Sequence, residues 1–102
     1  PRTGPGIVNN SLACALWPVA ARSAAPVSAP TAAPIVVVGT RRDPATPFAW
    51  AKSLVRQLGG DAVLISAPGA HHTSFGMGDP CVDGAVVRYL VDLTAPRQTL
   101  VC

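Results

Sequence analysis

"PIVVVGTRRDPATPFAWAKSLVRQLGGDAVLIS", residues 34–66, is the stretch that decides the fold. It opens and closes with short, largely apolar runs, at 35–38 and 62–66, whose β-branched residues are typical of strands covered on both faces. Between these runs, apolar residues recur at helical spacing over 51–58, and two glycines then end the pattern. A strand, a helix and a second strand in this order predict two parallel strands joined by a right-handed crossover.

Both predicted helices begin at a capping signal. Thr46 followed by proline offers a hydroxyl N-cap for the first helix. Asp79 followed by proline does the same for a second helix, because apolar residues then recur at helical spacing over 82–93. Two parallel strands and two helices cannot form an independent domain, since both faces of a parallel sheet need cover. We therefore predict an α/β fold in which residues 34–93 are the edge of a larger, doubly wound, mostly parallel sheet.

Composition limits the classes of function that the chain can serve. Apolar residues make up 49% and charged residues 13% of its 102 positions, against roughly 25% charged residues in ordinary soluble domains, so part of the apolar surface is expected to need a partner. The net charge of +3 comes from scattered basic residues, without the basic and aromatic stripe of a nucleic-acid-binding surface. No apolar run reaches the roughly 18 residues of a membrane span.

Residues 1–33 differ from the rest of the sequence. The run "AARSAAPVSAPTAAP", at 20–34, shows neither helical nor strand periodicity, so we interpret residues 1–33 as a Pro/Ala-rich connecting segment that leads into residues 34–102. The first residues have neither the pattern of a signal sequence nor an initiating methionine. The chain is therefore expected to be a processed product or a fragment.

Two residues that could carry chemistry follow the two predicted strands: Asp43 comes shortly after the first and His72 shortly after the second. Loops at the carboxyl ends of parallel strands converge on one crevice, so these side chains are expected to meet. A carboxylate there can orient an imidazole and stabilise its cation when it takes a proton from serine. We interpret Asp43 and His72 as the acid and base of a catalytic triad, while the alternative for Asp43 is an ordinary turn before proline.

The serine of such a triad is not recognisable in the sequence. In α/β-hydrolases the triad runs in the order serine, acid, histidine, with the serine in a G-x-S-x-G motif. The acid and base follow that order here, but no serine of the chain lies in this motif. The nucleophile is therefore expected upstream, on the N-terminal part of the same hydrolase, and these 102 residues are expected to be inactive alone.

The three cysteines, Cys14, Cys81 and Cys102, lack the spacing of a zinc site. The adjacent histidines His71 and His72 do not form a metal-binding pair either, because neighbouring side chains on an extended loop point in opposite directions. We therefore expect no metal and no cofactor. Cys81 opens the second helix and Cys102 ends the chain, which suggests a disulfide staple in an oxidising compartment and leaves Cys14 for a disulfide with another segment. The alternative is three reduced thiols in a cytosolic fragment.

Four further side chains receive structural interpretations. Trp50 is expected to pack the first helix onto the sheet, with the lining of a substrate pocket as the alternative. Asp83 lies in the first turn of the second helix, where a carboxylate favours the positive end of the helix dipole. Thr73 and Ser74 are expected to satisfy backbone groups around the histidine loop.

Three blocks follow one another at matching spacing: "GTRRDPATP" at 39–47, "GAHHT" at 69–73 and "PCVDGAV" at 80–86. In this order, and with the terminal cysteine, they resemble the C-terminal region of the tripeptidyl-aminopeptidase-like α/β-hydrolases, a group of secreted or envelope-associated serine peptidases of actinobacteria. The resemblance covers residues 34–102 and implies a C-terminal segment of the α/β-hydrolase fold.

The resemblance also assigns residues. The family's triad acid falls on Asp43 and its base on His72. Where the family usually has a small residue before the catalytic histidine, this sequence has His71, but alignment on the following Thr73 favours His72.

The disulfide that closes the family's tail falls on Cys81 and Cys102, and the lid region is the candidate origin of residues 1–33. These features imply a secreted or cell-envelope location. The function that the resemblance implies is a serine exopeptidase of the aminopeptidase type, acting on a peptide or a small acyl substrate. Two alternatives stay open: an esterase of the same superfamily, and a disulfide-stabilised envelope or binding module without enzymatic activity.

Overall fold

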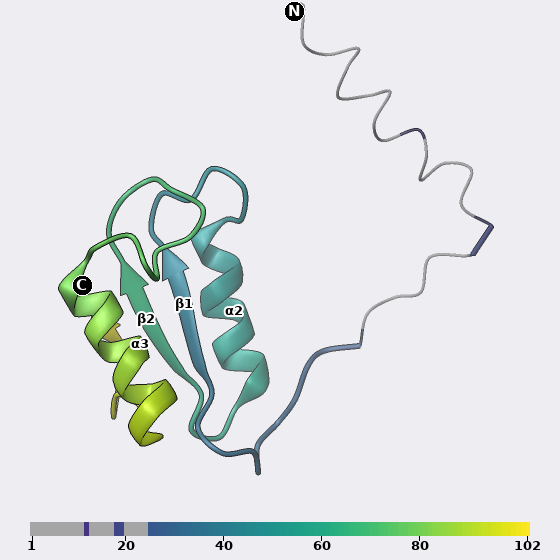
Figure 1. Ribbon diagram of the computed structural model, residues 1–102. Helices are drawn as coiled ribbons and strands as arrows, with labels where there is room; N and C mark the ends of the chain where they lie inside the picture. The colour runs from purple at the N-terminus through teal and green to yellow at the C-terminus, as the bar shows by residue number, and fades with distance from the viewer. Residues whose placement is uncertain (1–11, 13–17, 20–24) are drawn as a thin grey trace, which may run out of the picture.

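The computed structural model describes residues 12, 18, 19 and 25–102 (Figure 1). Its centre is a parallel sheet with the strand order β1-β2-β3, formed by Val36–Thr40, Val63–Ala67 and Leu100–Val101. The α/β class and the parallel pairing of the first two strands are as the sequence predicts. Strands β1 and β2 each end where a loop with a candidate catalytic residue begins, Asp43 after β1 and His72 after β2.

Strand β3 is absent from the sequence prediction, which has only two strands. It pairs with β2 in parallel, with Ile65 opposite Leu100 and Ser66 opposite Val101. The backbone N–H of Cys102 then donates to the Ser66 carbonyl at 3.0 Å. A strand of two residues has no periodicity to detect, so its existence depends on the neighbouring strand and not on its own sequence pattern.

Helix α2, Phe48–Leu58, connects β1 to β2. The prediction that Thr46 caps this helix is wrong, because Pro47 occupies the N-cap position and no side chain caps the helix. The backbone N–H and the hydroxyl of Thr46 instead both donate to the Asp43 carboxylate. At the other end Gly59, with a φ of 66°, lets the chain leave the helix in a conformation that residues with a Cβ rarely adopt.

Helix α3, Pro80–Asp92, begins where the sequence predicts. The Asp79 carboxylate accepts hydrogen bonds from the backbone N–H groups of Cys81 at 2.9 Å and Val82 at 3.1 Å, as an N-cap residue should. Val82 and Val86 are the buried residues of the helix and belong to the core cluster.

The two helices cover opposite faces of the sheet. Val36 and Val38 of β1 pack against the core cluster that contains Val82 of α3. The next residue, Gly39, faces α2, since a Cβ built on it would lie 2.8 Å from the Cβ of Ala51. Successive strand residues point to opposite faces, so α2 and α3 lie on the two sides of the strands, as Figure 1 shows.

The outer side of α3 is apolar. Val87, Leu90 and Val91 are between 48% and 73% exposed, and Leu93, directly after the helix, is 80% exposed. This surface agrees with the excess of apolar residues in the composition. No helix of the described residues is long and apolar enough to cross a membrane.

A disulfide joins Cys81 to Cys102, whose Cα atoms are 5.8 Å apart. It connects the first turn of α3 to the residue that follows β3, and Cys102 packs against the core cluster. Cys14, the predicted partner of another segment, lies outside the described residues.

Candidate active site

Asp43 lies in a tight turn that follows β1. Its backbone N–H donates to the Thr40 carbonyl. One carboxylate oxygen, Oδ1, accepts the N–H of Ala45 at 2.7 Å and that of Thr46 at 3.0 Å, while Oδ2 accepts the Thr46 hydroxyl at 2.6 Å. The side chain is only 4% exposed, so the turn holds the carboxylate in one position.

These hydrogen bonds also fix the charge of Asp43. The Thr46 hydroxyl, together with the backbone N–H groups of Thr46 and Ala45 and the His72 side chain, holds the pKa of the Asp43 carboxyl far below its ordinary value, although burial acts in the opposite direction. Asp43 is therefore an anion at any pH at which a hydrolase would work. The two interpretations of Asp43, a turn residue and a catalytic acid, are compatible, because the hydrogen bonds of the turn hold the carboxylate in position.

His72 reaches this carboxylate from the loop that follows β2. Its Nδ1 lies 3.0 Å from Oδ2 and 3.3 Å from Oδ1 of Asp43. An ionised carboxylate can only accept, so Nδ1 carries the proton and donates it. In the neutral ring Nε2 is then left with a free lone pair. The His72 side chain is 59% exposed, so this lone pair is accessible to a reacting group.

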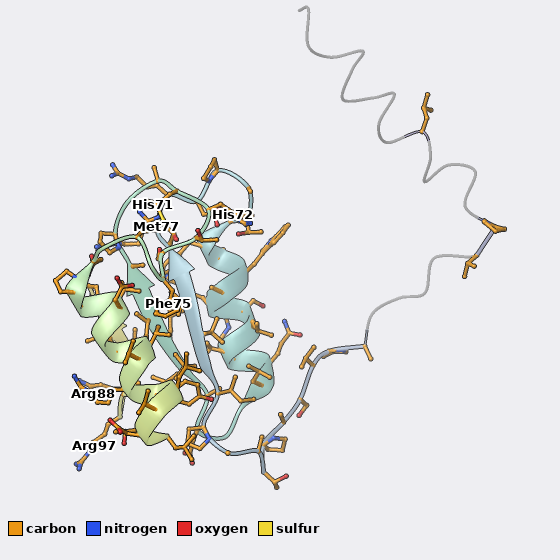
Figure 2. All side chains as sticks on the ribbon, viewed as in Figure 1. His71, His72, Phe75, Met77, Arg88 and Arg97 are labelled. Carbon is orange, nitrogen blue, oxygen red and sulfur yellow. A yellow bond between two sulfur atoms is a disulfide. The ribbon has the colours of Figure 1, made fainter. Side chains whose placement is uncertain are left out.

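His71 has a different environment. Its Nδ1 lies 2.6 Å from the Thr73 carbonyl, to which it donates, and its ring lies against Gly69. Gly69 has a φ of 96°, and a Cβ on it would lie 2.5 Å from His71 Nε2. In Figure 2 His72 lies on the α2 side of the loops and His71 on the α3 side. Of the two histidines, the structure thus brings only His72 to Asp43. His72 is also the histidine that alignment on Thr73 favours.

A pocket of about 280 Å³ opens beside this pair. Trp50 lines it and is 63% exposed, so the prediction that Trp50 packs α2 onto the sheet is wrong and the alternative, a residue that lines the pocket, agrees with the structure. Phe75 also lines the pocket and is 48% exposed. The remaining lining residues come from β1, the turn, α2 and the histidine loop: Val38, Gly39, Thr40, Asp43, Thr46, Pro47, Phe48, Ala51, His72, Thr73 and Ser74.

Ser74 of the histidine loop and Asp83 of α3 make contacts that the sequence analysis does not predict. Ser74 does not satisfy a backbone group: its hydroxyl lies 2.6 Å from the hydroxyl of Thr40, and both residues are buried. Asp83 accepts the backbone N–H groups of Gly76 at 2.8 Å and Gly78 at 3.2 Å. It therefore secures the end of the loop, in addition to lying in the first turn of α3.

Neither a nucleophile nor a metal site is completed by the described part of the chain. No serine or threonine hydroxyl of residues 25–102 is hydrogen-bonded to His72. The one group of potential metal ligands within that range is Asp79, Cys81 and Cys102, and its two sulfur atoms are joined in the disulfide. A disulfide offers no thiolate to a metal ion.

Thr40 and Thr46 were not among the predicted site residues. Both lie in the "GTRRDPATP" block, so the block marks the region. The Thr46 hydroxyl contacts Asp43 within the block, whereas the Thr40 hydroxyl contacts Ser74, which no local pattern identifies.

Comparison with known proteins places this geometry in context. The family model described as TAP-like protein matches residues 1–102. The chain is 48% identical to carboxylesterase B and 42% identical to serine protease Hip1, both of Mycobacterium tuberculosis, in alignments of 90 residues that cover 87% of the chain. It is 27% identical over 95 residues to tripeptidyl aminopeptidase of Streptomyces lividans, covering 90% of the chain. The chain spans 17% of the length of each of these curated relatives.

Proposed function

The chain belongs to the TAP-like family of α/β-hydrolases, as its sequence motifs predict, and we propose that it forms the part of a serine peptidase that carries the catalytic acid and base. The observation behind this proposal is the hydrogen bond between His72 and Asp43 at the carboxyl ends of adjacent parallel strands.

The roles follow from the direction of that hydrogen bond. With its proton on Nδ1, His72 takes the proton of an attacking serine at Nε2 and then gives it to the leaving amine. Asp43 keeps the ring in this tautomer and stabilises the imidazolium that forms in between. The low pKa of Asp43 supports this role, since the carboxylate stays charged while His72 changes its protonation.

The serine would come from the N-terminal part of the same hydrolase. Within the described residues β1 pairs only with β2, so its other edge has unpaired backbone groups. An unpaired edge of a parallel sheet is a template for a further strand. We propose that a preceding strand of the hydrolase pairs there and that the nucleophile follows such a strand in a G-x-S-x-G turn, close to His72.

We propose a peptide substrate, cleaved at its N-terminal end. Two relatives support this by name, a serine protease and a tripeptidyl aminopeptidase. The second candidate is ester hydrolysis, which the 48% identity to carboxylesterase B supports. A serine, His72 and Asp43 would serve in both peptide and ester hydrolysis. The two reactions differ in the acyl pocket and in the leaving group. A binding module is less well supported, because a module without chemistry has no need of an oriented and charged acid and base.

We further propose an extracytoplasmic location, in the cell envelope or outside the cell. The disulfide between Cys81 and Cys102 supports it, since such bonds persist in oxidising compartments. Residues 1–33 would serve as the connecting segment, from the lid region, and residues 34–102 as the closing part of the catalytic domain. Cys14 would pair with a cysteine of another segment.

Matched substrates test the function. The full-length hydrolase that contains these residues is given a tripeptide amide and the ester of the same tripeptide, with and without a free N-terminus. We expect amide cleavage only with a free N-terminus, and its loss after treatment with a fluorophosphonate. Cleavage of the ester alone would favour the esterase, and no cleavage of either together with no fluorophosphonate labelling would favour the binding module.

A further inference from the structure

Thr40 and Ser74 form a buried pair of hydroxyl groups. Their oxygen atoms are 2.6 Å apart, a normal distance for one hydroxyl donating to another, and the two residues are 34 positions apart in the sequence. Thr40 is 5% and Ser74 is 5% exposed. A buried hydroxyl without a partner is destabilising, so this pair favours one position of the two segments relative to each other.

The two segments that the pair joins are those of the candidate acid and base. Thr40 is the last residue of β1, and its carbonyl accepts the backbone N–H of Asp43. Ser74 lies two residues after His72, and its carbonyl accepts the N–H of Met77. The hydroxyl pair therefore links two points. One is the end of β1, where the turn that carries Asp43 begins, and the other is the part of the histidine loop that directly follows His72.

Few other links connect these segments. Among the described residues, the side-chain hydrogen bonds between 40–46 and 68–78 are the hydroxyl pair and the contact of His72 with Asp43. A backbone bond from Arg42 to the Gly69 carbonyl, at 3.2 Å, fixes the beginning of the loop. The His72 side chain is largely exposed, so packing does not orient its ring. The position of His72 then depends on the points at which its loop is attached.

We propose that Thr40 and Ser74 act as a positioning latch, in which their hydroxyl pair sets the distance between His72 and Asp43. Neither residue is a catalytic residue, since both act through His72. The proposal rests on the proposed function for its effect on turnover. Its effect on the His72 ring is independent of that function.

Substitutions of nearly unchanged shape test the latch in the full-length protein. Thr40→Val and Ser74→Ala each remove one hydroxyl and leave the other unpaired, whereas the double variant removes both. Replacing both partners by apolar groups is less destabilising than removing one, so the double variant separates loss of the latch from loss of the fold. Thr40→Ser keeps the hydroxyl. Ser53→Ala is the matched control, because the Ser53 hydroxyl lies on α2 and accepts only from the Gln57 side chain.

The first readout is the tautomer of His72, from long-range ¹H–¹⁵N spectra at a pH where the ring is neutral. We expect the proton on Nδ1 in the wild type, in Thr40→Ser and in Ser53→Ala. In the two single variants and in the double variant we expect a mixture of both tautomers. A His72 ring that keeps its proton on Nδ1 in the folded double variant would overturn the latch.

The second readout is turnover. We expect kcat to fall about 10- to 100-fold in Thr40→Val, in Ser74→Ala and in the double variant, with KM within about twofold of the wild type, because a small displacement of a catalytic group affects the transition state more than binding. Thr40→Ser should stay within about threefold. A double variant with wild-type kcat would overturn the proposal. If the wild type itself has no activity and is not labelled by a fluorophosphonate, the proposed function fails, and the tautomer readout still decides on the latch.

Discussion

His72 Nδ1 lies 3.0 Å from Asp43 Oδ2, although the two residues are 29 positions apart in the sequence. The two partners are held very differently. The Asp43 side chain is 4% exposed and accepts three further hydrogen bonds from its own turn, whereas the His72 side chain is 59% exposed. The turn thus holds the carboxylate without help from His72, and the hydrogen bond to Nδ1 orients the imidazole.

Replacing Thr46 by valine should change the titration of Asp43. Thr46 contributes the largest of the effects that lower the Asp43 pKa, so Thr46→Val should raise this pKa toward its ordinary value. A carboxyl with a lowered pKa in the folded state adds stability above its unfolded pKa of about 3.9, and this stability is lost as the pH falls through the folded pKa.

Thr46→Val should therefore be less stable than the wild type at pH 7, and the difference should narrow as the pH falls below about 4. Carboxyl ¹³C NMR titration of Asp43 and urea unfolding at several pH values measure both effects. Thr46→Ser keeps the hydroxyl and serves as control. An unchanged Asp43 titration in Thr46→Val would show that the hydroxyl is not its main determinant.

Gly39 should not tolerate alanine. A Cβ at this position would lie 2.8 Å from the Cβ of Ala51 and 3.0 Å from the Phe48 ring, so β1 and α2 would have to separate. We expect Gly39→Ala to lower the free energy of unfolding by about 1–3 kcal/mol, the usual range for overpacking. Gly84→Ala is the matched control: apart from the adjoining helix backbone, a Cβ added at Gly84 would meet no atom of the described residues within 4 Å, and alanine should stabilise α3 by about 0.5–1 kcal/mol. Equal unfolding curves for the two variants would contradict this packing.

Opening the disulfide should destabilise the end of the sheet. Cys81 and Cys102 close a loop with a sequence separation of 21, and a crosslink over such a loop contributes about 3 kcal/mol. The Cys81→Ser/Cys102→Ser variant should lose about this amount, measured by thermal unfolding. Peptide mapping of the wild type is the accompanying test: if both cysteines are alkylated without prior reduction, the pairing is wrong.

The sequence predicts the framework well because each of its elements carries a local signal. The β-branched runs mark β1 and β2, and Asp79 before proline marks the start of α3. The meeting of Asp43 and His72 follows from topology, since the carboxyl ends of adjacent parallel strands lie side by side.

The errors concern residues whose side-chain partners the helix and strand patterns do not specify. Thr46 has the sequence of an N-cap, but a carboxylate three residues earlier competes for its hydroxyl and its N–H. Trp50 lies in a helix that packs on the sheet, yet the residue itself lines the pocket and is 63% exposed. The bond between Thr40 and Ser74 spans 34 positions and has no sequence signature at all.

The most direct test of the account compares the two adjacent histidines. The full-length wild type, His72→Ala, His71→Ala and Asp43→Asn are incubated with a fluorophosphonate probe, and the rate at which the probe labels the nucleophilic serine is measured. We expect His72→Ala to slow labelling by about 10³-fold or more, Asp43→Asn by about 10³- to 10⁴-fold, and His71→Ala by less than about threefold. Equal labelling rates in the wild type and His72→Ala, or a greater loss in His71→Ala, would contradict the assignment of His72 as the base.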